Sequence, residues 1–215
     1  MIDILFIDCG SHRDAKEIDM MTEVCRSLGL RSAMYAIEPN PTYTDGLIEK
    51  FSKTNVIVLP VAVSCHTTIA KLYNSKSSNG HGSSLFDSKD NIDLDDYWNV
   101  QTIRMSSLLN TLKELHQPKI TVLKYNIEGS EWSIINELID TDMHVDVDIY
   151  CGAPCDMHKV ESLKNLQQEF DEKCVENGVF KYMFYHSLIP EENAAMISEM
   201  KALVREAMRR VAECD

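Results

Sequence analysis

The sequence predicts an α/β fold in which helices flank a mostly parallel central sheet. Short apolar runs alternate with segments whose apolar residues recur at helical spacing, and several runs end in an acid, a glycine or a proline, as buried strands do where they lead into loops. Strand–helix–strand repeats at this spacing favour right-handed crossovers and hence parallel strands. The 215 residues, of which 44% are hydrophobic, suit a single domain with a sizeable core.

The amino-terminal part of the chain carries the clearest repeats of strand and helix. The first apolar run ends at Asp8, and Gly29 follows the first helical pattern as a helix-terminating glycine. Thr44 or Asp45 can cap the second helix. The elements expected here are a strand at residues 4–8, a helix at 14–28, a strand at 32–37, a helix to about residue 53 and a strand at 55–59.

The middle of the chain is less regular. Two short runs at residues 61–64 and 69–73 indicate a β-hairpin, and residues 74–96, rich in Ser, Gly, Asn and Asp, indicate a long loop of the kind that forms lids. The elements expected after this loop are strands at 100–104, 120–125, 145–150 and 179–185, and helices at 106–116, 131–138 and 157–176.

The last part of the chain, residues 190–215, has apolar residues at helical spacing and predicts an amphipathic C-terminal helix. Its apolar stripe needs a partner. Packing against its own domain is the plainer expectation, and a homodimer formed through this helix is the alternative.

Composition argues against several classes of partner. The formal net charge is −13 and the basic residues are scattered, so nucleic acid and membrane surfaces are not expected partners. The amino terminus lacks the basic segment of a signal peptide, and no run approaches the roughly 18 apolar residues of a membrane helix. Seven cysteines at irregular spacing indicate reduced thiols rather than a disulfide framework. We therefore expect a cytoplasmic protein.

Acidic residues at the ends of two successive strands are the most informative feature. Asp8 and Gly10 follow the first strand, and Glu38 follows the second. Ligands of open α/β sheets bind beyond the carboxyl ends of the strands, where a carboxylate can accept hydrogen bonds from both hydroxyls of a ribose. A glycine in the first loop lets the backbone approach such a ligand closely.

The first loop argues against a dinucleotide. From Gly10 it reads Gly-Ser-His-Arg-Asp, so the later glycines of a GxGxxG pattern are absent. A pyrophosphate could not then approach the following helix closely, and Asp14 would repel it. A cationic ligand without a pyrophosphate tolerates these acids.

Six segments resemble those of the FkbM-type methyltransferases in order and spacing, over roughly residues 3–150. They are FIDCGSHRD (6–14), YAIEPNP (35–41), VAVS (61–64), GSSL (82–85), VQTIRMSSLL (100–109) and LKYNIEGSEW (123–132). The resemblance implies a Rossmann-like class I methyltransferase fold. It also implies an enzyme that uses S-adenosylmethionine (SAM) to methylate a hydroxyl on a small metabolite or sugar.

The resemblance also implies roles for individual residues. Asp8, Gly10 and Ser11 would lie beside the methionine part of SAM, and Glu38 would hold the ribose hydroxyls. The residues expected near the adenine are Asn40, Val61 and Ala62. The residues expected to face the site from the central strand are Lys124, Asn126, Glu128 and Glu131, with Ser83 and Ser84 in the loop over the acceptor.

Two departures from the family pattern affect these expectations. In the first loop the family reads Asp-x-Gly-Ala-Asn-x-Gly. Here Ser11 and His12 replace the Ala and Asn, and Asp14 replaces the second glycine. The family's Asp before x-Glu-Gly is Asn126 here, and an amide cannot act as a general base. The candidates for that role, in order of preference, are Glu128, His12, His81 and Lys124.

Two other functions are compatible with these residues. The altered first loop and Asn126 favour a catalytically silent protein that binds SAM or a partner. A metal-assisted transferase is the third possibility, with Asn126, Glu128 and an acid from the run at residues 93–96 as ligands. No dedicated metal site is expected from the cysteine and histidine spacing.

Overall fold

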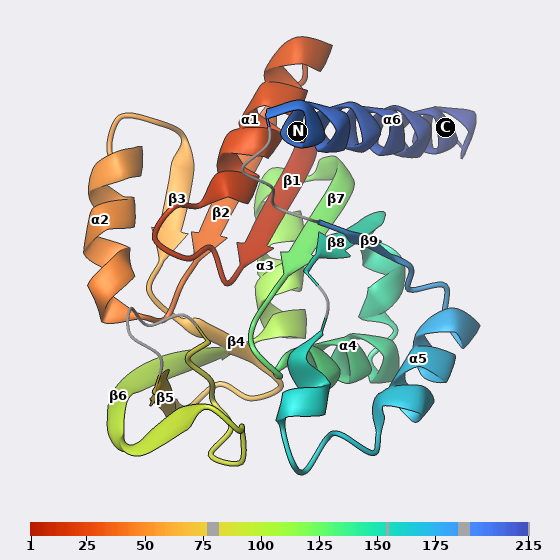
Figure 1. Cartoon of the computed structure of the whole chain (residues 1–215). Coiled ribbons are helices and arrows are strands. Elements are labelled where there is room, and N and C mark those ends of the chain that lie inside the picture. The colour runs from red at the N-terminus through yellow and green to blue at the C-terminus, as the bar shows by residue number, and fades with distance from the viewer. Residues whose placement is uncertain (77–81, 154, 185–189, 215) are drawn as a thin grey trace.

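The computed structural model describes residues 1–76, 82–153, 155–184 and 190–214. Its centre is a six-stranded sheet in the order β3-β2-β1-β7-β8-β9, in which every neighbouring pair is parallel (Figure 1). The strands are β1 (Ile2–Cys9), β2 (Ser32–Ile37), β3 (Val56–Leu59), β7 (Pro118–Tyr125), β8 (Ile149–Gly152) and β9 (Lys181–Met183). The expected α/β class and parallel sheet are confirmed.

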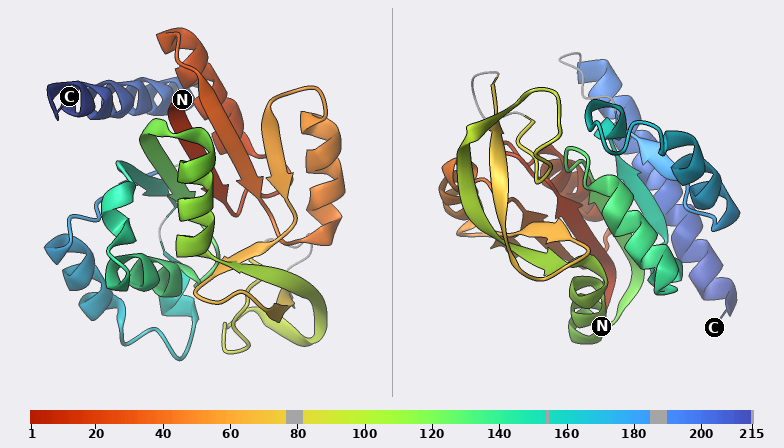
Figure 2. Two further views of the ribbon diagram at one scale, coloured as in Figure 1. Left: turned by 180° about the vertical axis from the view of Figure 1, so that it is seen from behind. Right: turned by 90° about the horizontal axis from the view of Figure 1, so that it is seen from below.

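Helices cover both faces of this sheet, as the two views of Figure 2 show. One face packs against α1 (Lys16–Leu28), α2 (Pro41–Phe51) and α6 (Pro190–Cys214). The other packs against α3 (Met105–His116), α4 (Glu131–Asp140) and α5 (Gln167–Glu176).

The alternation of side chains along β1 explains this three-layer arrangement. Ile4 and Phe6 point into the core on one face, and Leu5 and Ile7 into the core on the other. All four are fully buried. A strand buried on both faces needs a continuous apolar run, which is the pattern that the sequence has here.

A smaller sheet lies below the carboxyl ends of β1 and β2, and here the expected hairpin was wrong. Its order is β4 (Ala62–Ser64), β6 (Ile92–Arg104), β5 (Ile69–Ser75). β4 pairs in parallel with β6, and β5 pairs with β6 in antiparallel fashion. Period-two alternation identifies a strand but not its neighbour. The 13-residue β6 also includes residues 92–96 of the expected loop, and it runs directly into α3.

Two helix starts also differ from expectation. α1 begins at Lys16 rather than Asp14, because Ala15 has a left-handed backbone with φ of 43°. α2 begins at Pro41, earlier than a cap at Thr44 or Asp45 would place it. Asn40 caps it, and a proline suits the first helical position because the missing N–H has no helical partner there.

The carboxyl-terminal part departs further from the expected elements. The strand expected at 145–150 is a 3-10 turn, η1 (Met143–Asp146), followed by β8. The helix expected from residue 157 is a second 3-10 turn, η2 (Asp156–Lys159), then turns, then α5. The last expected strand is shorter, and its end at Tyr185 lies outside the described residues.

The C-terminal helix α6 is confirmed and packs on its own chain. Met200, Val204 and Ala207 are almost completely buried in the core that includes α1 and the sheet. A homodimer through α6 remains a prediction. Within the described ranges, no helix combines the length and apolar character that crossing a membrane requires.

Candidate active site

A cavity of about 310 Å³ opens beyond the carboxyl ends of β1 and β2. β1 has β2 on one side and β7 on the other, so the order of the sheet reverses at this strand, which is where ligands of such folds bind. The walls come from the loops after β1, β2 and β7, from α1, and from the small sheet. The lining residues include Gly10, Ser11, His12, Glu17, Glu38, Asn40, Tyr43, Val61, Ala62, Leu72, Ser83, Lys124, Asn126 and Glu128.

No residue other than glycine could occupy position 10 without a shift of the neighbouring backbone. Its φ is 79°, and a Cβ built on it would lie 2.1 Å from the carbonyl oxygen of Asn126. The Asn126 N–H donates to the Cys9 carbonyl at 3.1 Å, and the Gly10 N–H donates to Ile37 at 2.9 Å. The first loop is therefore fastened to the ends of β7 and β2, although it lacks the family's other glycine.

Lys124 lies behind this loop in a buried cluster of charges. Its Nζ is 2.8 Å from Asp8 Oδ1 and 3.7 Å from Glu17 Oε1, and it donates to the Gly10 carbonyl at 2.7 Å. Burial raises the pKa of Asp8 to about 6 against the opposing effect of Lys124. Burial alone would lower the pKa of Lys124, but the two carboxylates raise it above its ordinary value.

These contacts favour a structural role for both residues. Lys124 is protonated and supports the first loop, which does not fit the role of a base. The Asp8 side chain is fully buried on Lys124, and Asp8 is not among the residues that line the cavity. Sequence reasoning placed both residues at the correct strand ends but could not show that they neutralise each other.

Glu38 connects the loops after β1 and β2. One carboxylate oxygen accepts the His12 N–H at 2.8 Å, and the other accepts the Asn40 N–H at 2.9 Å. Burial raises the pKa of Glu38, and these two N–H groups oppose the rise. Each oxygen keeps a second lone pair, so the carboxylate can still accept two hydroxyl groups from the cavity side.

Asn40 presents an unsatisfied donor at the same wall. Its Oδ1 accepts the Thr42 N–H at 2.9 Å, which caps α2 and fixes the orientation of the amide. Its Nδ2 is buried and has no hydrogen-bond partner among the described residues. A buried donor without a partner is unfavourable, and Asn40 itself lines the cavity.

The wall next to Asn40 is apolar and aromatic. Val61 and Ala62 line it, as the resemblance implied, together with Leu72 from β5. The His12 ring contacts the Tyr43 ring edge to face, with centroids 4.7 Å apart. This places His12 next to Tyr43 and the loop that carries Glu38.

The turn after β7 forms the opposite wall. Asn126 and Glu128 both line the cavity. Glu131 does not face the cavity as expected: it is fully buried, and its two oxygens accept the N–H groups of Ile127 and Gly129 at 2.8 and 2.7 Å. It holds the turn that presents Glu128. Ser83 lines the cavity, and Ser84 donates to the Glu128 carbonyl at 2.7 Å.

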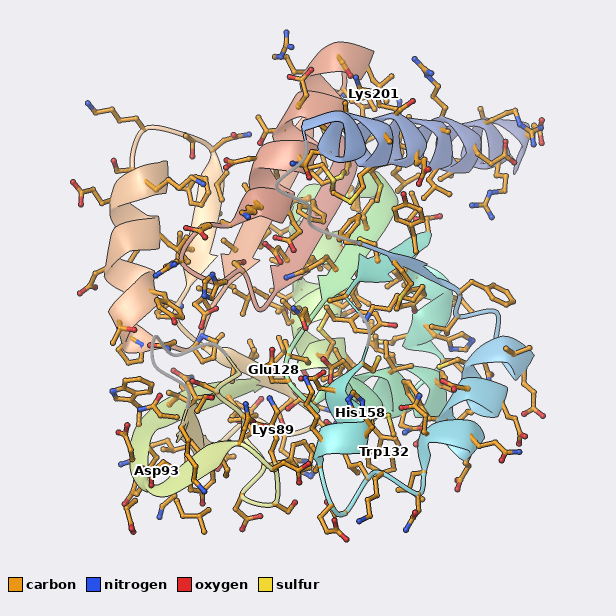
Figure 3. The ribbon with its side chains drawn as sticks, viewed as in Figure 1. Lys89, Asp93, Glu128, Trp132, His158 and Lys201 are labelled. Carbon is orange, nitrogen blue, oxygen red and sulfur yellow. The ribbon has the colours of Figure 1, made fainter. Side chains whose placement is uncertain are left out.

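Two residues that the sequence did not point to surround the Glu128 carboxylate. Lys89 has a fully buried side chain that contacts Glu128 and lies 3.6 Å from Asp156 (Figure 3). Burial and a hydrogen bond with Asp156 raise the pKa of Glu128 to about 7, against the opposing effect of Lys89. Lys89 lies in the expected loop and Asp156 in η2, so no spacing connected them.

The structure does not assemble the ligands of the metal-assisted alternative. Asp93 lies at the outer end of the small sheet, far from Glu128 in Figure 3. In the described part of the chain, no group of three or more His, Cys, Asp or Glu side chains gathers closely enough to hold a metal ion. His81, another candidate base, lies outside the described residues.

The parallel sheet and the cavity at its reversal point define a Rossmann-like α/β fold. The chain belongs to the FkbM methyltransferase family, because the sequence model of the methyltransferase FkbM domain matches residues 8–202. Comparisons with curated proteins and with solved structures gave no match. The family resemblance seen in the short motifs is confirmed and extends well beyond residue 150.

Proposed function

We propose that this methyltransferase uses SAM to methylate a hydroxyl group on a small metabolite or sugar. The observation that carries the donor half of the proposal is the pairing of Glu38 with the unsatisfied Asn40 amide on one wall. A carboxylate that can accept two hydroxyls, next to a buried donor and an apolar surface, matches the ribose and adenine of a nucleoside.

The residues present fit SAM better than a dinucleotide. The cavity lining contains four acids, Asp14, Glu17, Glu38 and Glu128, against two lysines, Lys16 and Lys124, so it is acidic on balance. Such a lining attracts a sulfonium cation and repels a pyrophosphate. When bound, SAM supplies a methyl group activated by this positive sulfur. In our proposal Glu38 and Asn40 hold the nucleoside, and the loop at Gly10 and Ser11 holds the amino-acid part.

The acceptor half of the proposal rests on Glu128. Asn126 cannot take a proton at neutral pH, whereas the Glu128 carboxyl lines the cavity and has a pKa near 7. A base works best when its pKa lies near the pH of the reaction. Holding an acceptor hydroxyl against this carboxylate would both orient the oxygen and remove its proton.

Calorimetric titration with SAM and with its demethylated product tests the donor half. We expect binding in the wild type and at least a tenfold loss in Asn40→Asp, which keeps the oxygen that caps α2 but replaces the free N–H donor. Glu38→Ala should abolish binding, with circular dichroism to show that the chain is folded. Glu49→Gln, an exposed glutamate of α2, is the matched control and should bind normally. Normal binding by both site variants would overturn the proposal.

Incubation with isotope-labelled SAM and a panel of small hydroxyl compounds tests the acceptor half by mass spectrometry. We expect label on an oxygen of at least one compound, and its loss in Glu128→Gln. Binding of SAM without transfer to any sugar, polyol or polyketide in the panel would instead support the silent binding protein that Asn126 suggests.

A further inference from the structure

We propose that Glu128, Asp156 and Lys89 form one proton-accepting unit, in which Glu128 receives the acceptor's proton and the other two are positioning residues. The inference rests on the proposed function, because the unit faces the same cavity. It assigns roles to two residues, Lys89 and Asp156, that lie outside the motifs shared with the family.

The three side chains of this unit are buried to different degrees. The Lys89 side chain is 0% exposed, that of Asp156 14% and that of Glu128 26%. Lys89 donates to the Gly82 carbonyl at 3.0 Å and contacts the Glu128 carboxylate. The two carboxylates lie beside the same ammonium, since Lys89 Nζ contacts Glu128 and is 3.6 Å from Asp156 Oδ2. A fully buried ammonium between two carboxylates is rarely incidental, because an unpaired charge there would be strongly destabilising.

Backbone contacts hold the parts of the unit in place. The segment that carries Lys89 forms an antiparallel bridge with Val160, just after η2. The Asp90 N–H donates to the Lys159 carbonyl at 2.9 Å, and the Glu161 N–H donates to Ser88 at 3.1 Å. Lys89 and Asp156 therefore approach Glu128 from segments that are themselves joined.

Charge explains why the unit accepts one proton. Glu128, Asp156 and the buried Lys89 together carry a net charge of −1, and one added proton makes these three groups neutral. Lys159 adds a positive charge beside Asp156, but its side chain is 44% exposed, so solvent screens it. Two neighbouring carboxylates repel each other when both are ionised. The pair of Glu128 and Asp156 therefore holds one proton more tightly than a single carboxylate does. Burial raises the pKa of Asp156, but Glu128 and then Lys159, 2.9 Å away, lower it, which favours the proton on Glu128.

The other charged groups around Glu128 fit this assignment. Lys89 faces it from the segment between β5 and β6, and Asp156 and Lys159 face it from η2. Glu131 of α4 lies under the turn, where two backbone N–H groups satisfy it. In the proposed step the acceptor O–H bond breaks and leaves its electron pair on oxygen for the new bond to carbon. The proton forms an O–H bond with Glu128, which loses its negative charge.

The test measures proton uptake directly and needs neither SAM nor an acceptor. Glutamate labelled at the side-chain carboxyl carbon is incorporated, and the Glu128 signal is assigned from its loss in Glu128→Gln. In the wild type this signal should titrate near pH 7. Asp156→Asn removes the like charge and should lower the Glu128 pKa by about one pH unit or more. Lys89→Met should raise it, and Lys89→Arg should restore it.

Glu161→Gln, an exposed carboxylate just after η2, is the matched control and should leave the Glu128 signal unchanged. Asp156→Asn preserves the size of the side chain and decides the result if Lys89→Met does not fold. Titration of Glu128 near 4.5, unmoved by Asp156→Asn, would overturn the unit even if SAM binds. Failure of SAM binding with the expected titration would overturn the proposed function and leave the unit standing.

Discussion

The two walls of the cavity hold their carboxylates in different ways. On the wall formed by the loops after β1 and β2, Glu38 is bound by backbone N–H groups of His12 and Asn40. On the wall after β7, Glu128 is bound by the charged side chains of Lys89 and Asp156. The backbone donors favour the ionised form of Glu38 against the effect of burial, whereas the neighbouring Asp156 favours the protonated form of Glu128. The first wall is suited to binding and the second to proton transfer.

The largest effect that we expect concerns Lys124, the buried cation that holds the loop after β1. Lys124→Met leaves the Asp8 and Glu17 carboxylates buried without a cation, which should lower the free energy of unfolding by about 3–5 kcal/mol. Denaturant unfolding measures it. Lys119→Met is the matched control, since Lys119 also lies on β7 and pairs with an aspartate of β1, Asp3, but is 43% exposed. It should cost less than about 1 kcal/mol, and equal losses would contradict the distinction.

The next effect concerns the contact between the two walls. Gly10→Ala places a methyl group against the Asn126 carbonyl in a left-handed backbone, which should destabilise the fold by about 3 kcal/mol. SAM affinity should fall with it. Gly46→Ala serves as the control, because a Cβ there meets nothing within 4 Å inside α2, and it should be neutral or slightly stabilising. Thermal unfolding of both variants measures the difference.

A smaller effect should appear as a pH dependence of stability on the second wall. The folded chain raises the pKa of Glu128 from 4.5 to about 7, so between these values the folded state binds its proton more tightly than the unfolded state does. The wild type should therefore lose about 2 kcal/mol relative to Glu128→Gln as the pH rises through this range. Unfolding curves at several pH values measure this, and parallel curves for the two proteins would contradict it.

The smallest effect separates the two walls by function. His12→Asn removes the ring contact with Tyr43 and should weaken SAM binding by about 1 kcal/mol, less than tenfold. Because His12 belongs to the binding wall, the acidic limb of the pH–rate profile should stay where it is. A shift of that limb in His12→Asn, together with full transfer activity in Glu128→Gln, would assign the base to His12 instead.

The sequence predicted the first wall better than the second for a physical reason. Gly10 and Glu38 directly follow apolar runs, so their positions at strand ends can be read locally. The surroundings of Glu128 depend on Lys89 and Asp156, which approach through loop and 3-10 backbone without any periodic pattern. The unsatisfied amide of Asn40 was equally invisible, because only the contact with Thr42 shows which way the amide points.

The errors in the fold have the same origin. The run at residues 69–73 was recognised as a strand, yet its partner is β6, more than 15 residues away along the chain, rather than the nearby β4. The helix expected from residue 157 is interrupted at Val160, whose backbone is extended where it bridges Lys89. Tertiary contacts decided both places, and local preference could not show them.

The parallel pairing of β4 with β6 has a consequence for how such enzymes diversify. β4 and β6 run in the same direction, with Ala62 opposite Thr102 and Ser64 opposite Arg104. The chain between these two strands therefore begins and ends side by side, and exposed loops in such an excursion can change with little disturbance to the host domain. Leu72 and Lys89 lie within it but are tied to the cavity and to Glu128, so only its exposed parts are free to vary. A new specificity could evolve there while the nucleoside wall stays unchanged.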